Sequence, residues 1–265
     1  MNAPAPSWKL SYRPEAEEID VFERAFHCRL PVLIKGPTGC GKTRFVEHMA
    51  QRLNLPLYTI SCHDDLSATD LVGRHLIGSE GTFWQDGPLT RAVREGGICY
   101  LDEIVEARKD TTVVLHALSD DRRLLPIERT GEMLQAPASF MLVVSYNPGY
   151  QNLLKGLKPS TRQRFISLSF KHPGLEREQA IISSESGLDA AWAERLALLA
   201  QALRQSARDS LEEAPGTRLI VDAARMMAAG LEPRLACRVA IIECLSDDPE
   251  HIEALMRVVD MVMGR

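Results

Sequence analysis

A run of eight residues near the N-terminus has the composition of a phosphate-binding loop. The run fits the pattern G-x-x-x-x-G-K-[ST] and reads Gly36-Pro37-Thr38-Gly39-Cys40-Gly41-Lys42-Thr43. Its glycines let successive backbone N–H groups point at phosphate oxygens, and a helix that begins there adds a favourable dipole. We expect Lys42 to reach the β- and γ-phosphates and the Thr43 hydroxyl to ligate Mg²⁺. The run therefore predicts a site for ATP and Mg²⁺.

Two acids follow a second apolar run, Ile98–Leu101. The carboxyl ends of strands in an open α/β sheet share one edge, so this run would deliver both acids beside the phosphates. We expect Asp102 to hold Mg²⁺ through water. Glu103 is a candidate general base that orients or deprotonates the attacking water. An apolar run that ends in Asp-Glu is common, but behind a phosphate loop it predicts hydrolysis of the nucleotide.

A neutral amide ends another apolar strand. Asn147 follows Met141–Tyr146 and would lie at the same sheet edge, where its side chain could position the lytic water. The alternative is a turn residue at a strand end, because Asn-Pro-Gly is itself turn-forming.

Three arginines could reach phosphate. Arg162 and Arg164 lie in a basic segment just before the last strand, and guanidinium groups there could stabilise the transferring phosphoryl group from a neighbouring subunit. A solvated basic loop is the alternative. Arg218 opens a later helix, where a positive charge opposes the macrodipole. It could reach phosphate or lie on the surface.

Short apolar runs alternate with helix-period segments over the first 170 residues, which is typical of a doubly wound α/β fold with a parallel sheet. The predicted strands are Pro31–Lys35, Leu57–Ser61, Gly97–Leu101, Phe140–Tyr146 and Phe165–Phe170. From Leu175 onward only helices are predicted, over Leu175–Ser184, Ala190–Arg208, Arg218–Ala229, Pro233–Leu245 and Pro249–Met263. The breaker cluster His172-Pro173-Gly174 divides an α/β nucleotide-binding domain, residues 1–172, from a small all-α domain, residues 173–265.

Two stretches interrupt the first domain. Gly78–Gly87 places Phe83 and Trp84 among glycines and polar residues. If these two aromatic side chains are exposed, they mark a contact with a partner. If they instead pack against the domain, they are a pair of core residues. Leu124–Ala136 has two β-like arms around Arg129-Thr130-Gly131, which predicts a hairpin.

The composition is that of a globular protein, with 45% hydrophobic and 25% charged residues, which argues against disordered and fibrous classes. The net charge of −5 argues against nucleic acid as a partner. The six cysteines are scattered without a C-x-x-C pair, which favours reduced thiols. The first 18 residues lack the apolar core of a signal peptide, and no run of about 18 apolar residues could span a membrane. We expect a cytoplasmic protein without a membrane partner.

Taken in order, these residues resemble an AAA+ ATPase over roughly Glu15 to Met263. The Walker A and Walker B motifs match Gly36–Thr43 and Ile98–Glu103. The first sensor matches Asn147, the arginine-finger segment matches Arg162–Arg164, and the sensor of a helical lid matches Arg218. The phrases LPVLIKGPTGCGKT, GRHLIGSEGTFWQDGPLTRAVREGG and NPGYQNLLKGLKPSTRQRF are similar to the CbbQ/NirQ/NorQ group of the MoxR branch, most of all to its Rubisco activase members.

The resemblance implies a homo-hexameric ring with ATP at the subunit interfaces and arginine fingers supplied in trans. It implies a five-stranded parallel sheet, a helical lid, and inserts in helix 2 (about 78–87) and before the first sensor (about 124–136). It also implies an adaptor with a von Willebrand factor A domain. The target would be inhibited Rubisco or, alternatively, nitric oxide reductase during its maturation. In such a ring Phe83 and Trp84 could line the pore or touch the partner.

Two other classes of protein also carry a phosphate loop. A small-molecule P-loop kinase would need an acceptor pocket and could be a monomer. A nucleic-acid-directed AAA+ protein fits poorly, because the charge balance is acidic and no GAFTGA-like loop is present.

Overall fold

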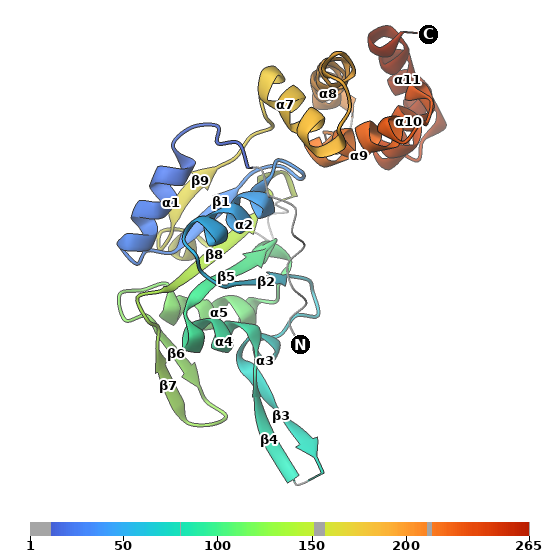
Figure 1. The fold of residues 1–265 in the computed structure, drawn as a ribbon. Helices are drawn as coiled ribbons and strands as arrows, with labels where there is room; N and C mark the ends of the chain where they lie inside the picture. The colour runs from blue at the N-terminus through green and yellow to red at the C-terminus, as the bar shows by residue number, and fades with distance from the viewer. Residues whose placement is uncertain (1–11, 80, 151–156, 211–213, 265) are drawn as a thin grey trace. The chain divides into compact units, whose positions relative to one another are not determined.

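The computed structural model describes residues 12–79, 81–150, 157–210 and 214–264 (Figure 1). Glu80 of the predicted insert lies outside these ranges. Residues 151–156, which belong to the family-like segment NPGYQNLLKGLKPSTRQRF, also lie outside them. The chain divides into two compact units, residues 1–36 with 42–170 and residues 37–41 with 171–265. Within the described ranges, no helix has both the length and the apolar composition needed to cross a bilayer.

A five-stranded parallel sheet is the centre of the first unit, as predicted. Its order is β2-β5-β8-β1-β9, so the first strand along the chain lies between two late ones. The strands are β1 (Val32–Lys35), β2 (Leu57–Ser61), β5 (Gly97–Asp102), β8 (Phe140–Tyr146) and β9 (Ile166–Ser169). β5 and β8 are almost wholly buried, which explains why they read as continuous apolar runs.

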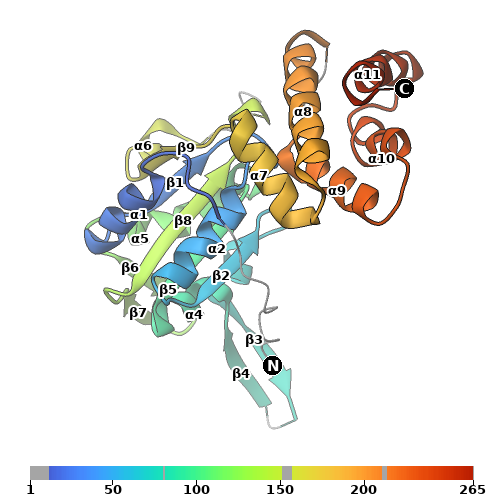
Figure 2. The ribbon, with the colours of Figure 1, turned by 45° about the horizontal axis from the view of Figure 1, so that its top comes forward.

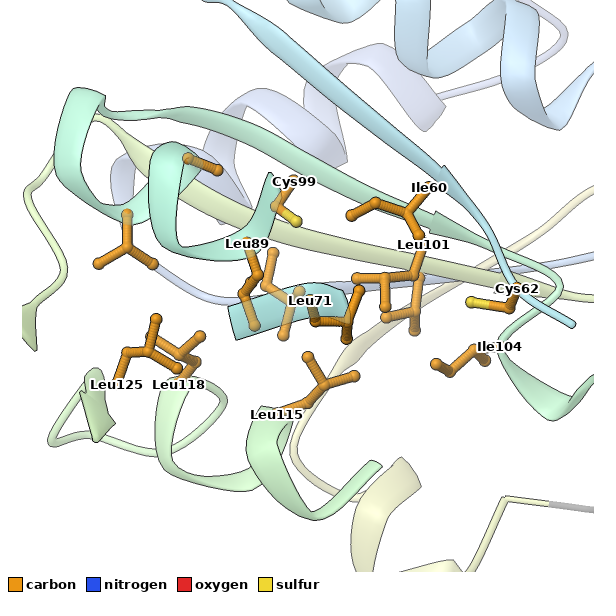
Figure 3. Packing of buried hydrophobic residues seen from close by; sticks show 14 of the residues in the cluster. Ile60, Cys62, Leu71, Leu89, Cys99, Leu101, Ile104, Leu115, Leu118 and Leu125 are labelled. Atoms are coloured by element: carbon orange, nitrogen blue, oxygen red, sulfur yellow. The ribbon is translucent and has the colours of Figure 1, made fainter. Parts of the chain in front are cut away.

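Helices pack on both faces of this sheet (Figure 2). α1 (Glu18–His27) and α2 (Lys42–Arg52) contribute to one buried cluster. α3 (Ala68–Val72), α4 (Pro88–Glu95) and α5 (Lys109–Leu118) contribute to the other, which includes the side chains drawn in Figure 3. Because strand side chains alternate between faces, Tyr100 belongs to the cluster of α1 and α2, and Leu101 to the opposite one.

Two antiparallel hairpins extend this unit. β6 (Leu124–Ile127) pairs with β7 (Glu132–Gln135), at the place where a hairpin was predicted. β3 (Gly73–Gly78) pairs with β4 (Gly81–Asp86), so the structured insert begins before Gly78, where the sequence placed its start. The first residue of this hairpin is Gly73, whose φ of 139° and close approach to Gln85 and Trp84 leave no room for a Cβ atom.

Arg94 of α4 joins the two hairpins. Its Nε donates to Asp86 Oδ2 at 2.7 Å, and its Nη1 donates to Glu132 Oε1 at 2.7 Å. The hydrogen bonds from Arg94 hold the pKa of the Glu132 carboxyl below its usual value. One guanidinium therefore links the end of β4 to the start of β7.

The second unit is helical and has its own buried core. Its helices are α7 (Leu175–Ser186), α8 (Ala190–Ser210), α9 (Thr217–Ala228), α10 (Pro233–Ala240) and α11 (Pro249–Met263). The sequence predicted one helix over Pro233–Leu245, and this prediction is wrong. The α-helix stops at Ala240, because Ile241 adopts a φ of −119°, and a 3₁₀ turn follows over Ile242–Cys244.

A buried ion pair joins three segments of the helical unit. Arg204 of α8 donates from Nη1 and Nη2 to the two carboxylate oxygens of Glu178, each at 2.6 Å. The Thr217 hydroxyl donates to Glu178 Oε1 at 2.7 Å. The Glu178 side chain is fully buried and that of Arg204 is 11% exposed.

Substituting Glu178→Ala should lower the free energy of unfolding by about 3 kcal/mol or more, because it leaves a buried guanidinium without its carboxylate. Urea denaturation followed by circular dichroism would measure this loss. Arg234→Ala, which breaks the exposed pair with Asp260, is the matched control and should cost far less. Equal losses in the two variants would contradict the assignment of Glu178 as a stabilising centre.

Candidate functional site

The predicted phosphate loop runs from the end of β1 to the start of α2. Gly41 has a φ of 96°, and no atom lies close to the place that a Cβ would occupy, so conformation and not space is what requires glycine there. Lys42 is the first residue of α2 and is buried. Its Nζ donates to the Gly36 carbonyl at 2.8 Å, so the ammonium lies back over the loop.

Both predicted acids lie at the carboxyl end of β5, next to the loop. Asp102 is the last residue of the strand, and its Oδ2 accepts a hydrogen bond from Thr43 Oγ1 at 3.2 Å. Glu103 Oε1 lies 3.5 Å from Lys42 Nζ. The structure therefore brings together the cation, the hydroxyl and both carboxylates that the two motifs supply.

Glu103 has a left-handed backbone, with φ 53° and ψ 52°. Such a conformation costs a residue with a side chain on the order of 1–3 kcal/mol, and it persists only where the surroundings impose it. Glu103 leaves the strand in this turn, and the 3₁₀ helix Ile104–Glu106 follows at once. The turn aims its carboxylate along the sheet edge toward Asn147.

Asn147 directly follows β8 and is buried. Its backbone N–H donates to Glu103 Oε2 at 3.1 Å, and its Oδ1 accepts from the Gly149 N–H at 3.0 Å. The side-chain oxygen thus takes part in a turn, as the alternative for this residue anticipated. Asn147 also contacts the candidate base, so its predicted role beside the lytic water fits its position.

The sequence missed two hydroxyls in this site, those of Tyr100 and Ser145. Tyr100 Oη donates to Asp102 Oδ1 at 2.7 Å and lies 3.0 Å from Ser145 Oγ. Burial, together with the negative charge of Asp102, raises the pKa of the Tyr100 phenol. Strand alternation could have indicated Tyr100, because it lies two residues before Asp102 on the same face.

The two predicted finger arginines lie at the end of a short helix of the first unit and just after it. Arg162 ends the short helix α6 (Pro159–Arg162) and is exposed. Arg164 donates from Nη1 to the His116 carbonyl at 3.2 Å, and the same nitrogen lies 3.7 Å from Asp120 Oδ2. Arg218 is the second residue of α9 in the helical unit and is exposed. None of these contacts involves Asp102 or Glu103, so the roles of the three arginines stay predictions.

The structure separates Phe83 from Trp84, because successive strand residues point to opposite faces of the hairpin. The Phe83 side chain is 52% exposed. Trp84 is half-buried against the core cluster, its ring meets His75 edge to face, and its Nε1 donates to Asp86 Oδ1 at 2.6 Å. Of the two, Phe83 alone is largely exposed, so contact with a partner stays a prediction for this residue, whereas Trp84 packs on the core at the base of the hairpin.

The oxygen donors at this edge fit Mg²⁺. Thr43 Oγ1 could ligate the ion directly, and Asp102 Oδ2, 3.2 Å from that hydroxyl, is close enough to accept a hydrogen bond from a water molecule on the ion. Within the described ranges, no cluster of three or more His, Cys, Asp or Glu side chains could hold a metal.

Two family models match the chain. Residues 31–165 match the AAA domain of the dynein-related subfamily, and residues 178–262 match the CbbQ/NirQ/NorQ C-terminal region. Among solved structures, a putative ATPase from Cytophaga hutchinsonii aligns with a TM-score of 0.51 at 15% identity, over 91% of this chain and 80% of that one. A RuvB variant from Thermotoga maritima aligns with a TM-score of 0.53 at 16% identity, over 92% and 69%. These two likenesses concern the fold.

Curated relatives are much closer in sequence. The denitrification regulatory protein NirQ of Pseudomonas aeruginosa is 65% identical over 94% of this chain and 96% of its own length. The protein NorQ of Paracoccus denitrificans is 57% identical over 96% and 94%. The protein CbbQ of Hydrogenophilus thermoluteolus is 51% identical over 92% and 91%.

The family matches, the relatives and the fold agree with one another. AAA+ proteins bind and hydrolyse nucleotide, and membership in this family indicates assembly into oligomers. The chain is therefore an ATPase that belongs to the CbbQ/NirQ/NorQ group of MoxR-type AAA+ proteins.

Proposed function

We propose that this ATPase is a ring-forming motor that remodels a protein complex, and that its turnover centres on Glu103. One observation carries the proposal. The base candidate contacts both the phosphate-loop lysine, at 3.5 Å, and the backbone of Asn147, at 3.1 Å. A nucleotide γ-phosphate held by Lys42 would thus lie beside a carboxylate that can activate water.

Each residue of the site has a proposed role. Residues 36–43 bind the phosphates through backbone N–H groups and through the ammonium of Lys42. Glu103 takes a proton from water at its carboxylate, and Asn147 orients that water. Thr43 and Asp102 would hold Mg²⁺, the latter through a water molecule. When bound, the ion neutralises charge on the β- and γ-phosphates.

The ring is proposed from the arginines and from the family. Among the described residues, neither Arg162 nor Arg164 contacts Asp102 or Glu103 of its own chain, which suits groups that act on the ATP of a neighbouring subunit. A closed homo-hexamer would repeat this heterologous contact at each of its interfaces. We assign Arg218 a different role, that of the sensor in the helical unit, which would reach phosphate.

For the target, we propose a denitrification complex, with nitric oxide reductase as the candidate. Identity is 65% to NirQ and 57% to NorQ, against 51% to CbbQ. These values favour the nitric oxide reductase alternative over the Rubisco target that the sequence suggested. Rubisco stays the second candidate, because the CbbQ relative also spans most of the chain. An adaptor with a von Willebrand factor A domain would connect the ring to either target, with Phe83 at the contact.

Purified chain with its adaptor should hydrolyse ATP only while Mg²⁺ is present, and chelation by EDTA should abolish turnover. Addition of immature nitric oxide reductase should raise the rate of phosphate release, whereas inhibited Rubisco should leave it unchanged. Serum albumin is the control for nonspecific stimulation. Stimulation by Rubisco alone would overturn the choice of target and leave the ATPase assignment untouched.

A further inference from the structure

The buried hydroxyls of Tyr100 and Ser145 both contact Oδ1 of the Asp102 carboxylate, and the Tyr100 hydroxyl also lies 3.5 Å from Thr43 Oγ1. Tyr100 Oη donates to Asp102 Oδ1 at 2.7 Å, and Ser145 Oγ donates to the same oxygen at 2.5 Å. Asp102 Oδ2 instead accepts from Thr43 Oγ1 at 3.2 Å. The two carboxylate oxygens thus have separate partners, and the rotation of the carboxylate is fixed.

Ser145 also reaches the candidate base. Its Oγ accepts a hydrogen bond from the backbone N–H of Glu103 at 3.3 Å. That N–H belongs to the residue with the left-handed backbone, so the serine helps to hold the turn in which Glu103 leaves β5. One hydroxyl on β8 therefore contacts both consecutive acids of β5.

These hydroxyls are unusual for their surroundings. Tyr100 and Ser145 are both fully buried, and every residue of β8 is buried. Burying a hydroxyl costs free energy of folding unless the hydroxyl is hydrogen-bonded. Apolar side chains would therefore be expected at both positions if they served packing alone. Both hydroxyls are directed at Asp102, which indicates a task tied to that carboxylate.

We propose that Tyr100 and Ser145 are positioning residues for the Mg²⁺ site. By occupying Oδ1, they keep Oδ2 beside Thr43, where the cation of the bound nucleotide would lie. The inference rests on the proposed function, since it takes Thr43 and Asp102 as the metal-holding pair. Groups that orient a metal-holding side chain typically affect metal affinity about 10–100-fold when removed.

Tyr100→Phe and Ser145→Ala each remove one hydroxyl while keeping the rest of the side chain. The readout is the Mg²⁺ concentration at half-saturation, measured by binding of methylanthraniloyl-labelled ADP and separately by ATP hydrolysis. Both variants should raise this concentration about tenfold. Binding of the labelled ADP in EDTA should stay within about twofold of wild type, because the phosphate loop is untouched.

Tyr146→Phe is the matched control. Tyr146 is a buried tyrosine at the end of β8, and it belongs to the cluster on the opposite face of the sheet from Tyr100. Its variant should leave the Mg²⁺ dependence unchanged. Thermal melting of all three variants would reveal any loss of folding.

The possible outcomes distinguish the positioning role of Tyr100 and Ser145 from the proposed Mg²⁺ site itself. Unchanged half-saturation in both Tyr100→Phe and Ser145→Ala, beside a wild type that needs Mg²⁺, would overturn the positioning role alone. Loss of thermal stability without a Mg²⁺ effect would also overturn it, by showing a purely structural role. A wild type that hydrolyses ATP equally well in EDTA would instead refute the proposed metal site.

Discussion

Glu103→Gln protein should bind ATP as wild type does, yet turn it over at least about 100-fold more slowly, which is the usual contribution of a general base. Glutamine has nearly the same shape and can still accept the hydrogen bond that Asn147 N–H donates to Oε2. It cannot take a proton from water. It also removes the negative charge that lies 3.5 Å from Lys42 Nζ, which should not weaken the hold of the lysine on phosphate.

Phosphate release and equilibrium binding of labelled ATP would measure the two quantities separately. Glu128→Gln is the control, because Glu128 is an exposed acid in the turn between β6 and β7. It should hydrolyse ATP at the wild-type rate. Turnover by Glu103→Gln above about a tenth of wild type would count against this residue as the base.

Arg162→Ala should lower turnover about 1,000-fold, at the lower end of what an arginine finger contributes, with ATP affinity little changed. The two arginines differ in how they are held. Arg164 is tied to the His116 carbonyl and to Asp120 of its own chain, whereas Arg162 is exposed at the end of α6. We therefore expect Arg162 to reach the nucleotide of the neighbouring subunit. Arg164 would instead hold the conformation of its own segment, so Arg164→Ala should lower turnover less than Arg162→Ala does.

Steady-state hydrolysis over a range of ATP concentrations would separate kcat from KM in these variants. Arg24→Ala, an exposed arginine of α1 paired with Asp20, is the control. If Arg164→Ala proves the more damaging change, the two assignments are reversed. Wild-type turnover in both variants would remove the arginine-finger role from this segment.

The framework of the fold was predictable because parallel strands are buried on both faces. Leu57–Ser61 and Phe140–Tyr146 have the predicted bounds, and the three other strands differ by one residue at one or both ends. The phosphate loop and its acids were predictable for a related reason. A loop between a strand and a helix, and acids at the end of a second buried strand, must meet at one sheet edge.

What the sequence did not predict depends on side chains that meet only in the folded chain. Ser145 looks like an ordinary member of an apolar strand until the pairing of β5 with β8 brings it to Asp102. Tyr100 is on the same strand as Asp102, but its burial hides it among the core residues. The hairpin of β3 and β4 is an isolated pair in which polar and apolar residues mix, so its early start gave little periodic signal. The helix break at Ile241 was also missed, because no glycine or proline lies at that position to indicate the end of a helix.

A mixing experiment tests most directly the claim that each active site combines Glu103 of one subunit with Arg162 of the next. Glu103→Gln protein and Arg162→Ala protein should each be inactive alone. Mixed rings should regain activity, because about a quarter of randomly formed interfaces would pair an intact Glu103 with an intact Arg162. Phosphate release measured across mixing ratios should therefore peak near equal amounts. No activity at any ratio, with mixed rings verified by a tag on one variant, would contradict catalysis shared between subunits.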